Sequence, residues 1–136
     1  MEPAKTAFVA CSKAKRSQPC KARDLYLGTL FKKSFAYASA NYPNVYILSA
    51  LHGVVHPDTV LEPYDQTLNQ MSAKERQAWY EMVREQMTQL QLPRPFVFFT
   101  GRLYNQAFDG YKPLEGLPIG KQLQWFTQRL RRPGFF

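Results

Sequence analysis

Three short segments carry the side chains that could do chemistry, and each directly follows a run of apolar residues. Cys11-Ser12-Lys13 follows the first run, residues 49–53 follow the second, and residues 101–104 follow the third. Buried parallel strands of an α/β sheet end at one edge, where loop amides and helix amino termini bind ligands. We therefore expect these three segments to meet in one functional site.

The first of these segments is strongly cationic. Lys13, Lys15 and Arg16 have the charge to hold a phosphate, and the Ser12 hydroxyl and the loop amides could add hydrogen bonds. The alternative is an ordinary solvated basic loop. The glycine spacing of a Walker phosphate loop is absent from the sequence.

Carboxylates and a histidine follow the second apolar run. Asp65 is the strongest candidate for catalysis, because a carboxylate over the sheet edge can stabilise a developing oxocarbenium charge or activate water. Asp58 and His52 are further candidates, with a loop cap, a salt bridge or a structural hydrogen bond as their alternatives. His52 and His56 lack the Cys or carboxylate partners of a metal site, so we expect neither a metal nor another cofactor.

Three tyrosines adjoin these segments. Tyr26, Tyr64 and Tyr104 could each stack on a nucleobase, whereas the remaining aromatic residues read mostly as core. The alternative for each is a ring at the edge of the core with its hydroxyl in water.

The charge of the chain favours an anionic partner. Its 136 residues include 18 Lys and Arg against 10 Asp and Glu, a net charge of +8, which suits nucleic acid, a nucleotide or phosphate. No export signal precedes Cys11 and Cys20, so we expect reduced thiols and a cytoplasmic protein. The apolar runs are too short to span a bilayer, and a monomer or a homodimer is expected.

The elements that must position these residues alternate between strand and helix. Strands are predicted at 6–10, 45–50 and 95–99, helices at 23–40, 72–90 and 120–131, a short helical segment after 101, and an irregular stretch at 51–71. Ser72 and Glu75 form a capping box. Right-handed crossover makes the first two strands parallel neighbours. The sequence therefore predicts one α/β domain over residues 1–136, a three-layer sandwich on a small, mainly parallel sheet.

Several blocks occur in an order that resembles a known family. They are Ala10–Lys13 with Lys15, Leu25-Tyr26, Ile47–Val55, Pro63-Tyr64-Asp65, and Gly101 with Tyr104. Over nearly its whole length the chain resembles a small bacterial and phage domain family of unassigned function. It is more distantly similar to the Cys-Ser-x-x-Lys domain of archaeosine synthases and related deazaguanine-handling proteins. That likeness rests on Cys11-Ser12, Ser49, Tyr64-Asp65 and Trp79.

The predicted sandwich is Rossmann-like or uracil-DNA-glycosylase-like. The distant likeness implies the glycosylase-like fold and a nucleobase or nucleic-acid pocket at the strand ends. The water-activating Gly-Gln-Asp-Pro-Tyr motif of uracil-DNA glycosylases is absent from the sequence, so their mechanism is not carried over. Chemistry at a glycosidic bond is what the resemblance suggests.

Three functions fit these observations. The first is an enzyme that processes nucleic acid or nucleotides, most concretely an N-glycosylase (a hydrolase) acting on a modified nucleobase. The second is a non-catalytic nucleic-acid-binding module, and the third is a small-nucleotide hydrolase or transferase. The expected catalytic residues are Asp65, His52 and Asp58. The expected substrate-binding residues are Cys11, Ser12, Lys13, Lys15, Arg16, Tyr26, Ser49, Gly53, Tyr64, Gly101 and Tyr104.

Overall fold

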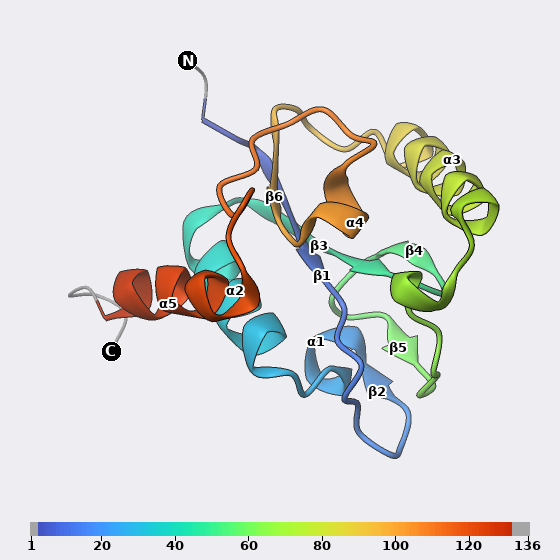
Figure 1. The fold of residues 1–136 in the computed structure, drawn as a ribbon, viewed down its shortest axis with the longest axis horizontal. Helices are drawn as coiled ribbons and strands as arrows, with labels where there is room; N and C mark the ends of the chain where they lie inside the picture. Colours follow the sequence, from blue (N-terminus) through green and yellow to red (C-terminus); the bar gives the residue numbers. More distant parts are fainter. Residues whose placement is uncertain (1–2, 132–136) are drawn as a thin grey trace.

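A four-stranded sheet forms the centre of the molecule (Figure 1). The computed structural model describes residues 3–131. The strands lie in the order β4-β3-β1-β6, and their bounds are Gly53–Val55 for β4, Asn44–Ser49 for β3, Thr6–Ala10 for β1 and Phe96–Phe99 for β6. β1 pairs in parallel with β3 and with β6, and β4 pairs antiparallel with β3. The predicted small, mainly parallel sheet and the parallel pairing of the first two strands are confirmed.

Helices and a short second ribbon surround this sheet. The helices are α1 (Ala22–Leu25), α2 (Thr29–Asn41), α3 (Ala73–Gln89), α4 (Arg102–Asn105) and α5 (Ile119–Leu130), with a 3-10 turn η1 at Leu68–Gln70. The ribbon pairs β2 (Cys20–Lys21) with β5 (Val60–Leu61) in antiparallel fashion. The chain therefore has the mixed α/β composition that the sequence predicts.

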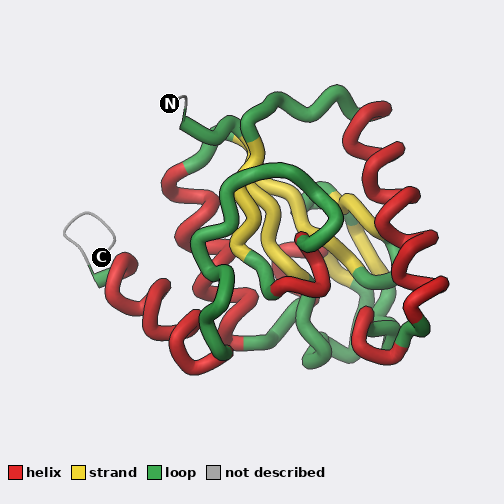
Figure 2. The backbone as a smooth tube through the Cα atoms, turned by 45° about the horizontal axis from the view of Figure 1, so that its top comes forward, coloured by secondary structure: helices red, strands yellow, loops and turns green. Residues whose placement is uncertain are grey.

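The sheet lies between two layers of helices (Figure 2). Successive side chains of a strand point to opposite faces, so Val9 packs with Phe31 of α2 and Phe126 of α5 on one face. On the other face Phe8 packs with Trp79 and Val83 of α3. Both faces of the central strand are buried, as in other sheets covered on two sides.

Two of the predicted elements differ from the structure. The helix expected over 23–40 is interrupted, because Tyr26 is extended and forms a β-bridge with Lys15 before α2 begins at Thr29. The stretch 51–71, expected to be irregular, contains β4, β5 and η1. Gly53, with a φ of 74°, makes the turn into β4, and a positive φ is a conformation that glycine adopts without strain.

Helix α3 begins as the sequence predicts. The Ser72 hydroxyl accepts a hydrogen bond from the Glu75 amide at 3.1 Å, and the Glu75 carboxylate accepts one from the Ser72 amide at 2.9 Å. Hydrogen bonding to the carboxylate lowers the pKa of Glu75. The helix ends at Gln89, and Leu90 after it is exposed.

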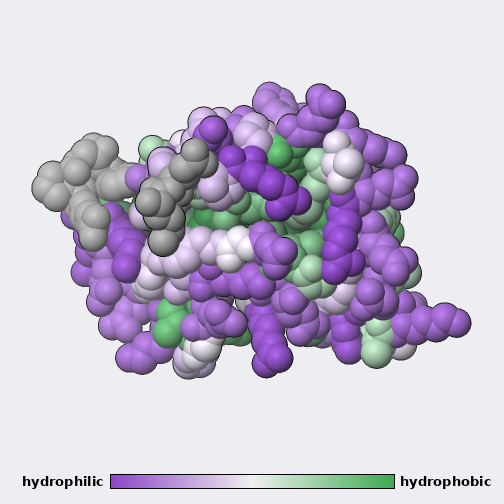
Figure 3. All heavy atoms as spheres, turned by 90° about the horizontal axis from the view of Figure 1, so that it is seen from above, coloured by the Kyte–Doolittle hydropathy of each residue, from purple (hydrophilic) through white to green (hydrophobic). Residues whose placement is uncertain are grey.

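The side of the molecule at which the parallel strands begin is partly apolar. Figure 3 looks onto the side where the strands begin and shows apolar atoms in a hollow bordered by hydrophilic residues. An apolar cavity there includes Pro95, Phe96 and Tyr111 in its wall.

Within residues 3–131, no helix is both long enough and apolar enough to cross a bilayer.

Candidate functional site

A cavity opens where β1 and β6 end. After β1 the chain leads to α2 on one face of the sheet, and after β6 it leads to α4 on the other. Adjacent parallel strands whose connections diverge in this way leave a crevice, which is where open α/β sheets bind ligands. The cavity has a volume of about 500 Å³, within the range of roughly 300–1,000 Å³ typical of small-molecule sites.

Five of the expected site residues contribute to this cavity. Cys11, Ser12 and Lys13 form the wall at the end of β1, and Gly101 and Tyr104 form the wall at the end of β6. The structure thus brings the first and third chemistry-bearing segments together.

The floor and the remaining walls come from residues other than the expected site residues. Phe31 and Phe99 are buried and form an apolar floor. The amino end of α2, which has no side-chain cap in the described structure, contributes Gly28. Asn69 and Gln70 of η1 form a polar wall. Thr67 and Gln70 have the Thr-x-x-Gln spacing of a capping box, and this sequence pattern could have predicted the turn η1.

The hydroxyl of Ser12 holds the cavity wall together. It donates to the Ala14 carbonyl at 2.9 Å and accepts from the Gly28 amide at 3.1 Å. Since a hydroxyl has one hydrogen to donate, Ser12 has none left for a phosphate in this conformation. The charge on this wall comes from Lys13, which is exposed.

Cys11 and Tyr104 contact each other in the cavity wall. The Cys11 sulfur lies 3.4 Å from the Tyr104 hydroxyl. Burial, with the nearby Cys11 as a smaller cause, raises the pKa of Tyr104, so the phenol keeps its proton at neutral pH. The half-buried Tyr104 ring packs edge-on against Trp79.

A second group of polar side chains lies beside the cavity, at the end of β3. We call Tyr26, Ser49 and Tyr64 the tyrosine cluster. The Tyr64 hydroxyl lies 2.7 Å from the Ser49 hydroxyl and 2.5 Å from the Tyr26 hydroxyl. The two tyrosines are far apart in sequence, so this contact depends on how the loop 51–71 folds back.

The Ser49 hydroxyl has a defined direction. It accepts hydrogen bonds from the amides of Leu51 and His52 at 3.2 and 3.0 Å. With both lone pairs occupied, its hydrogen points to Tyr64. The Ser49 carbonyl in turn accepts from the Trp79 indole at 3.0 Å, which links the end of β3 to α3.

The tyrosine cluster is neutral over the physiological range. Burial raises the pKa of Tyr26 to about 12, and burial followed by the proximity of Cys11 and Tyr26 raises the pKa of Tyr64. Removing the proton of either phenol would leave a poorly solvated charge.

Lys15 lies over this cluster. Its amine is 4.3 Å from the centre of the Tyr64 ring, a cation–π distance, and donates to the Lys13 carbonyl at 3.2 Å. Burial lowers the pKa of Lys15, and the nearby Cys11 and Asp65 oppose that shift. Asp65 is exposed and close enough to Lys15 to act on it electrostatically.

The structure corrects the role expected for Tyr26. Its side chain is 1% exposed and packs against Phe31 and Tyr64. A buried ring has no free face for a base. Of the three tyrosines, Tyr104 is the one that contributes to the cavity wall.

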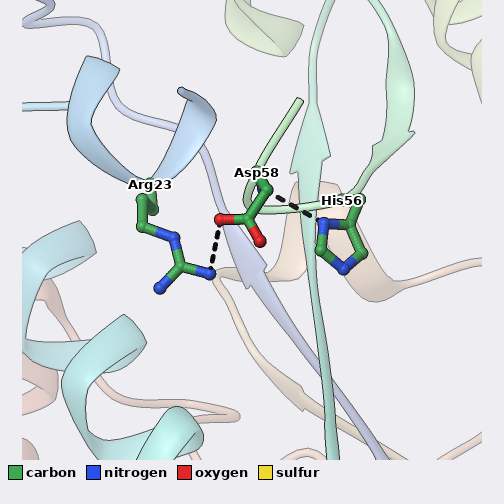
Figure 4. Close-up of polar contacts among 3 residues, drawn as sticks. All are labelled: Arg23, His56 and Asp58. Carbon is green, nitrogen blue, oxygen red and sulfur yellow. Dashed lines mark hydrogen bonds and ion pairs between the residues drawn. The ribbon is translucent and has the colours of Figure 1, made fainter. Parts of the chain in front are cut away.

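Four other expected residues lie away from the cavity wall, namely Asp58, Arg16, His52 and Gly53. Asp58 forms an ion pair with Arg23 at 2.7 Å, and its amide donates to His56 at 3.0 Å (Figure 4). Arg16 donates to the Asp24 carbonyl.

His52 and Gly53 belong to the turn after β3. The exposed His52 ring packs edge-on against Tyr64. Gly53 is buried, and the Gln86 side chain of α3 lies directly against its Cα. Its place is therefore at the packing of the turn against α3.

The described residues contain no group of three or more His, Cys, Asp or Glu side chains that could hold a metal ion. Cys11 and Cys20 are both unpaired thiols.

Comparison with known proteins locates the chain in one family. No curated protein and no solved structure matches it. The model of a family of unknown function (DUF6884) matches residues 6–128, in keeping with the expected resemblance to a domain family of unassigned function. Since the match covers most of the chain, including every residue that lines the cavity or forms the tyrosine cluster, the chain belongs to this family of unknown function.

Proposed function

We propose that this protein is an enzyme acting on nucleic acid or nucleotides, most concretely an N-glycosylase that removes a modified base. The observation that carries the proposal is the cavity between the ends of β1 and β6, which joins an aromatic interior to a cationic rim. A flat base suits the apolar floor beside Tyr104, and a phosphate suits Lys13 and the amino end of α2. The fold proposed is Rossmann-like or glycosylase-like, which agrees with a site at the strand ends.

The catalytic group in this proposal is Asp65. Cleavage of a glycosidic bond develops positive charge on the sugar, which a nearby carboxylate stabilises. Asp65 is exposed, acts electrostatically on Lys15 and does not contribute to the cavity wall. The sugar of a bound nucleotide would extend from the cavity towards it, with His52, which packs edge-on against Tyr64, as a second candidate. A base in a duplex would have to be flipped out first.

A second candidate function is a non-catalytic nucleic-acid-binding module. The observation that favours it is the position of the carboxylates, because Asp58 is engaged with Arg23 and neither Asp58 nor Asp65 contributes to the cavity wall. In this case Lys13 and Lys15 bind phosphates and no bond is cleaved.

The test is release of free base. The purified protein is incubated with DNA and RNA that carry natural and modified bases, and the released base is measured by mass spectrometry. We expect release by the wild type, loss of release with retained binding in Asp65→Asn, and no change in Asp109→Asn, a matched variant of an exposed aspartate outside the site. Binding without release from any substrate would replace the enzyme with the binding module.

A further inference from the structure

Lys15 belongs to the loop that contributes part of the cavity wall. Its carrier loop follows β1 directly, and the same loop contributes Cys11, Ser12 and Lys13 to the cavity wall. Lys15 itself pairs with Tyr26 through a β-bridge. The backbone on both sides of this lysine is therefore held by the sheet edge and by the segment between α1 and α2.

The amine has few partners in the structure. It donates to one carbonyl, that of Lys13, and it lies on the face of the Tyr64 ring. Within residues 3–131 the one salt bridge joins Arg23 to Asp58, so no carboxylate there comes within 4 Å of the Lys15 nitrogen. Asp65 and Cys11 act on it from a greater distance.

This setting favours amine chemistry. An ammonium group that is partly removed from water and not ion-paired loses its proton more easily than one in solution. The pKa of Lys15 is lowered by burial, which increases the neutral fraction. Lysine amines in their neutral form make Schiff bases with carbonyl compounds.

We propose that Lys15 forms an imine with the C1′ aldehyde of an abasic sugar, which is the group that base removal exposes. This proposal rests on the proposed function for its substrate class. The neutral amine adds to the C1′ carbon and forms a C–N bond. The carbonyl oxygen then leaves as water together with the two amine hydrogens, and the C=N bond remains. No oxidant or reductant takes part.

The experiment uses DNA that already contains an abasic site, so base removal is not required. The full-length protein is mixed with this DNA, sodium borohydride reduces the imine to a stable secondary amine, and the covalent complex is measured on a denaturing gel. We expect a trapped complex with the wild type and a reduction of about tenfold or more in Lys15→Arg, which keeps the charge but cannot form the imine. Lys33→Arg serves as the matched control, because Lys33 is a half-buried lysine of α2 outside the cavity wall.

Peptide mapping of the wild-type complex identifies the modified residue even if a variant fails to fold. Modification at Lys15 supports the proposal, whereas modification at another lysine or at the terminal amine overturns it, as does the absence of a trapped complex. Base release without trapping would leave the glycosylase in place and remove the imine. Trapping at Lys15 without base release from any substrate would support the imine and remove the glycosylase.

Discussion

The cavity and the tyrosine cluster lie side by side at the ends of neighbouring strands, yet they are built in opposite ways. The cavity is hollow, and its wall offers an exposed lysine and the uncapped amino end of α2. The tyrosine cluster is packed, and its hydroxyls hydrogen-bond to one another. The cavity therefore has open space and an exposed cationic side chain in its wall, whereas the cluster holds the end of β3 and the loop after it in place.

The largest expected effect concerns the packed region. Tyr64→Phe removes the hydroxyl that joins Ser49 to Tyr26, so each of these two hydroxyls loses a hydrogen bond. We expect the free energy of unfolding in urea to fall by about 2 kcal/mol. Tyr104→Phe removes a hydroxyl that contacts the Cys11 sulfur, a weak partner, and also interacts with the Leu68 backbone, and should lower the free energy of unfolding by about 1 kcal/mol. Equal losses would contradict the contrast between the two regions.

A smaller loss of stability is expected at the cavity wall. A Cβ on Gly28 would lie 2.7 Å from the Cβ of Ser12, so Gly28→Ala has to push the β1 loop away from α2. We expect it to lower the free energy of unfolding by about 1–2 kcal/mol and to weaken nucleotide binding. Gly120→Ala is the control, because a Cβ there has nothing within 4 Å and alanine favours the helix. A stable Gly28→Ala with unchanged binding would show that this wall tolerates movement.

The tyrosine cluster should also make stability depend on pH in the alkaline range. The pKa of Tyr26 is about 12 in the folded protein and about 10 in an unfolded chain. The unfolded state therefore binds fewer protons than the folded state between these pH values. The stabilising contribution of Tyr26 is complete below about pH 10 and is lost as the pH rises through about 12. Urea unfolding at several alkaline pH values should show a steeper fall for the wild type than for Tyr26→Phe. Tyr111→Phe, which changes an exposed tyrosine, should leave the slope unchanged.

The smallest effect is expected at the cavity rim. Lys13 is exposed, so Lys13→Ala should leave stability unchanged and weaken nucleic-acid binding moderately. If Lys13 neutralises one phosphate, the salt dependence of the affinity should fall by about one unit. Binding measured by fluorescence anisotropy at several salt concentrations gives this slope. An unchanged slope would move the phosphate away from this rim.

Much of the architecture followed from local patterns. The apolar runs at 6–10 and 95–99 could be buried only as strands covered on both faces. Ser72 and Glu75 identified the start of α3, because a capping box satisfies amides within one turn. The convergence of Cys11 and Tyr104 also followed, since parallel neighbours end at one edge.

Other features depended on contacts that are distant in the sequence. Whether Tyr26 faced a ligand or the core was decided by Tyr64, which reaches it from the loop after β3. The interruption between α1 and α2 was decided by the β-bridge to Lys15, which overrides the helical spacing of the apolar residues.

By itself, the sequence determined the type of chemistry available: which residues follow buried strands, the cationic character of the first loop, and the parallel order that brings strand ends together. Only the tertiary structure decided which of these side chains remain free. Hydrogen bonds commit Ser12 and Ser49, and an ion pair commits Asp58. Lys13 remains exposed at the cavity, and Cys11 and Tyr104, which contact each other, line it. The reason is physical, because local patterns record burial and turn formation, whereas the partner of a polar group is set by whichever distant segment folds against it.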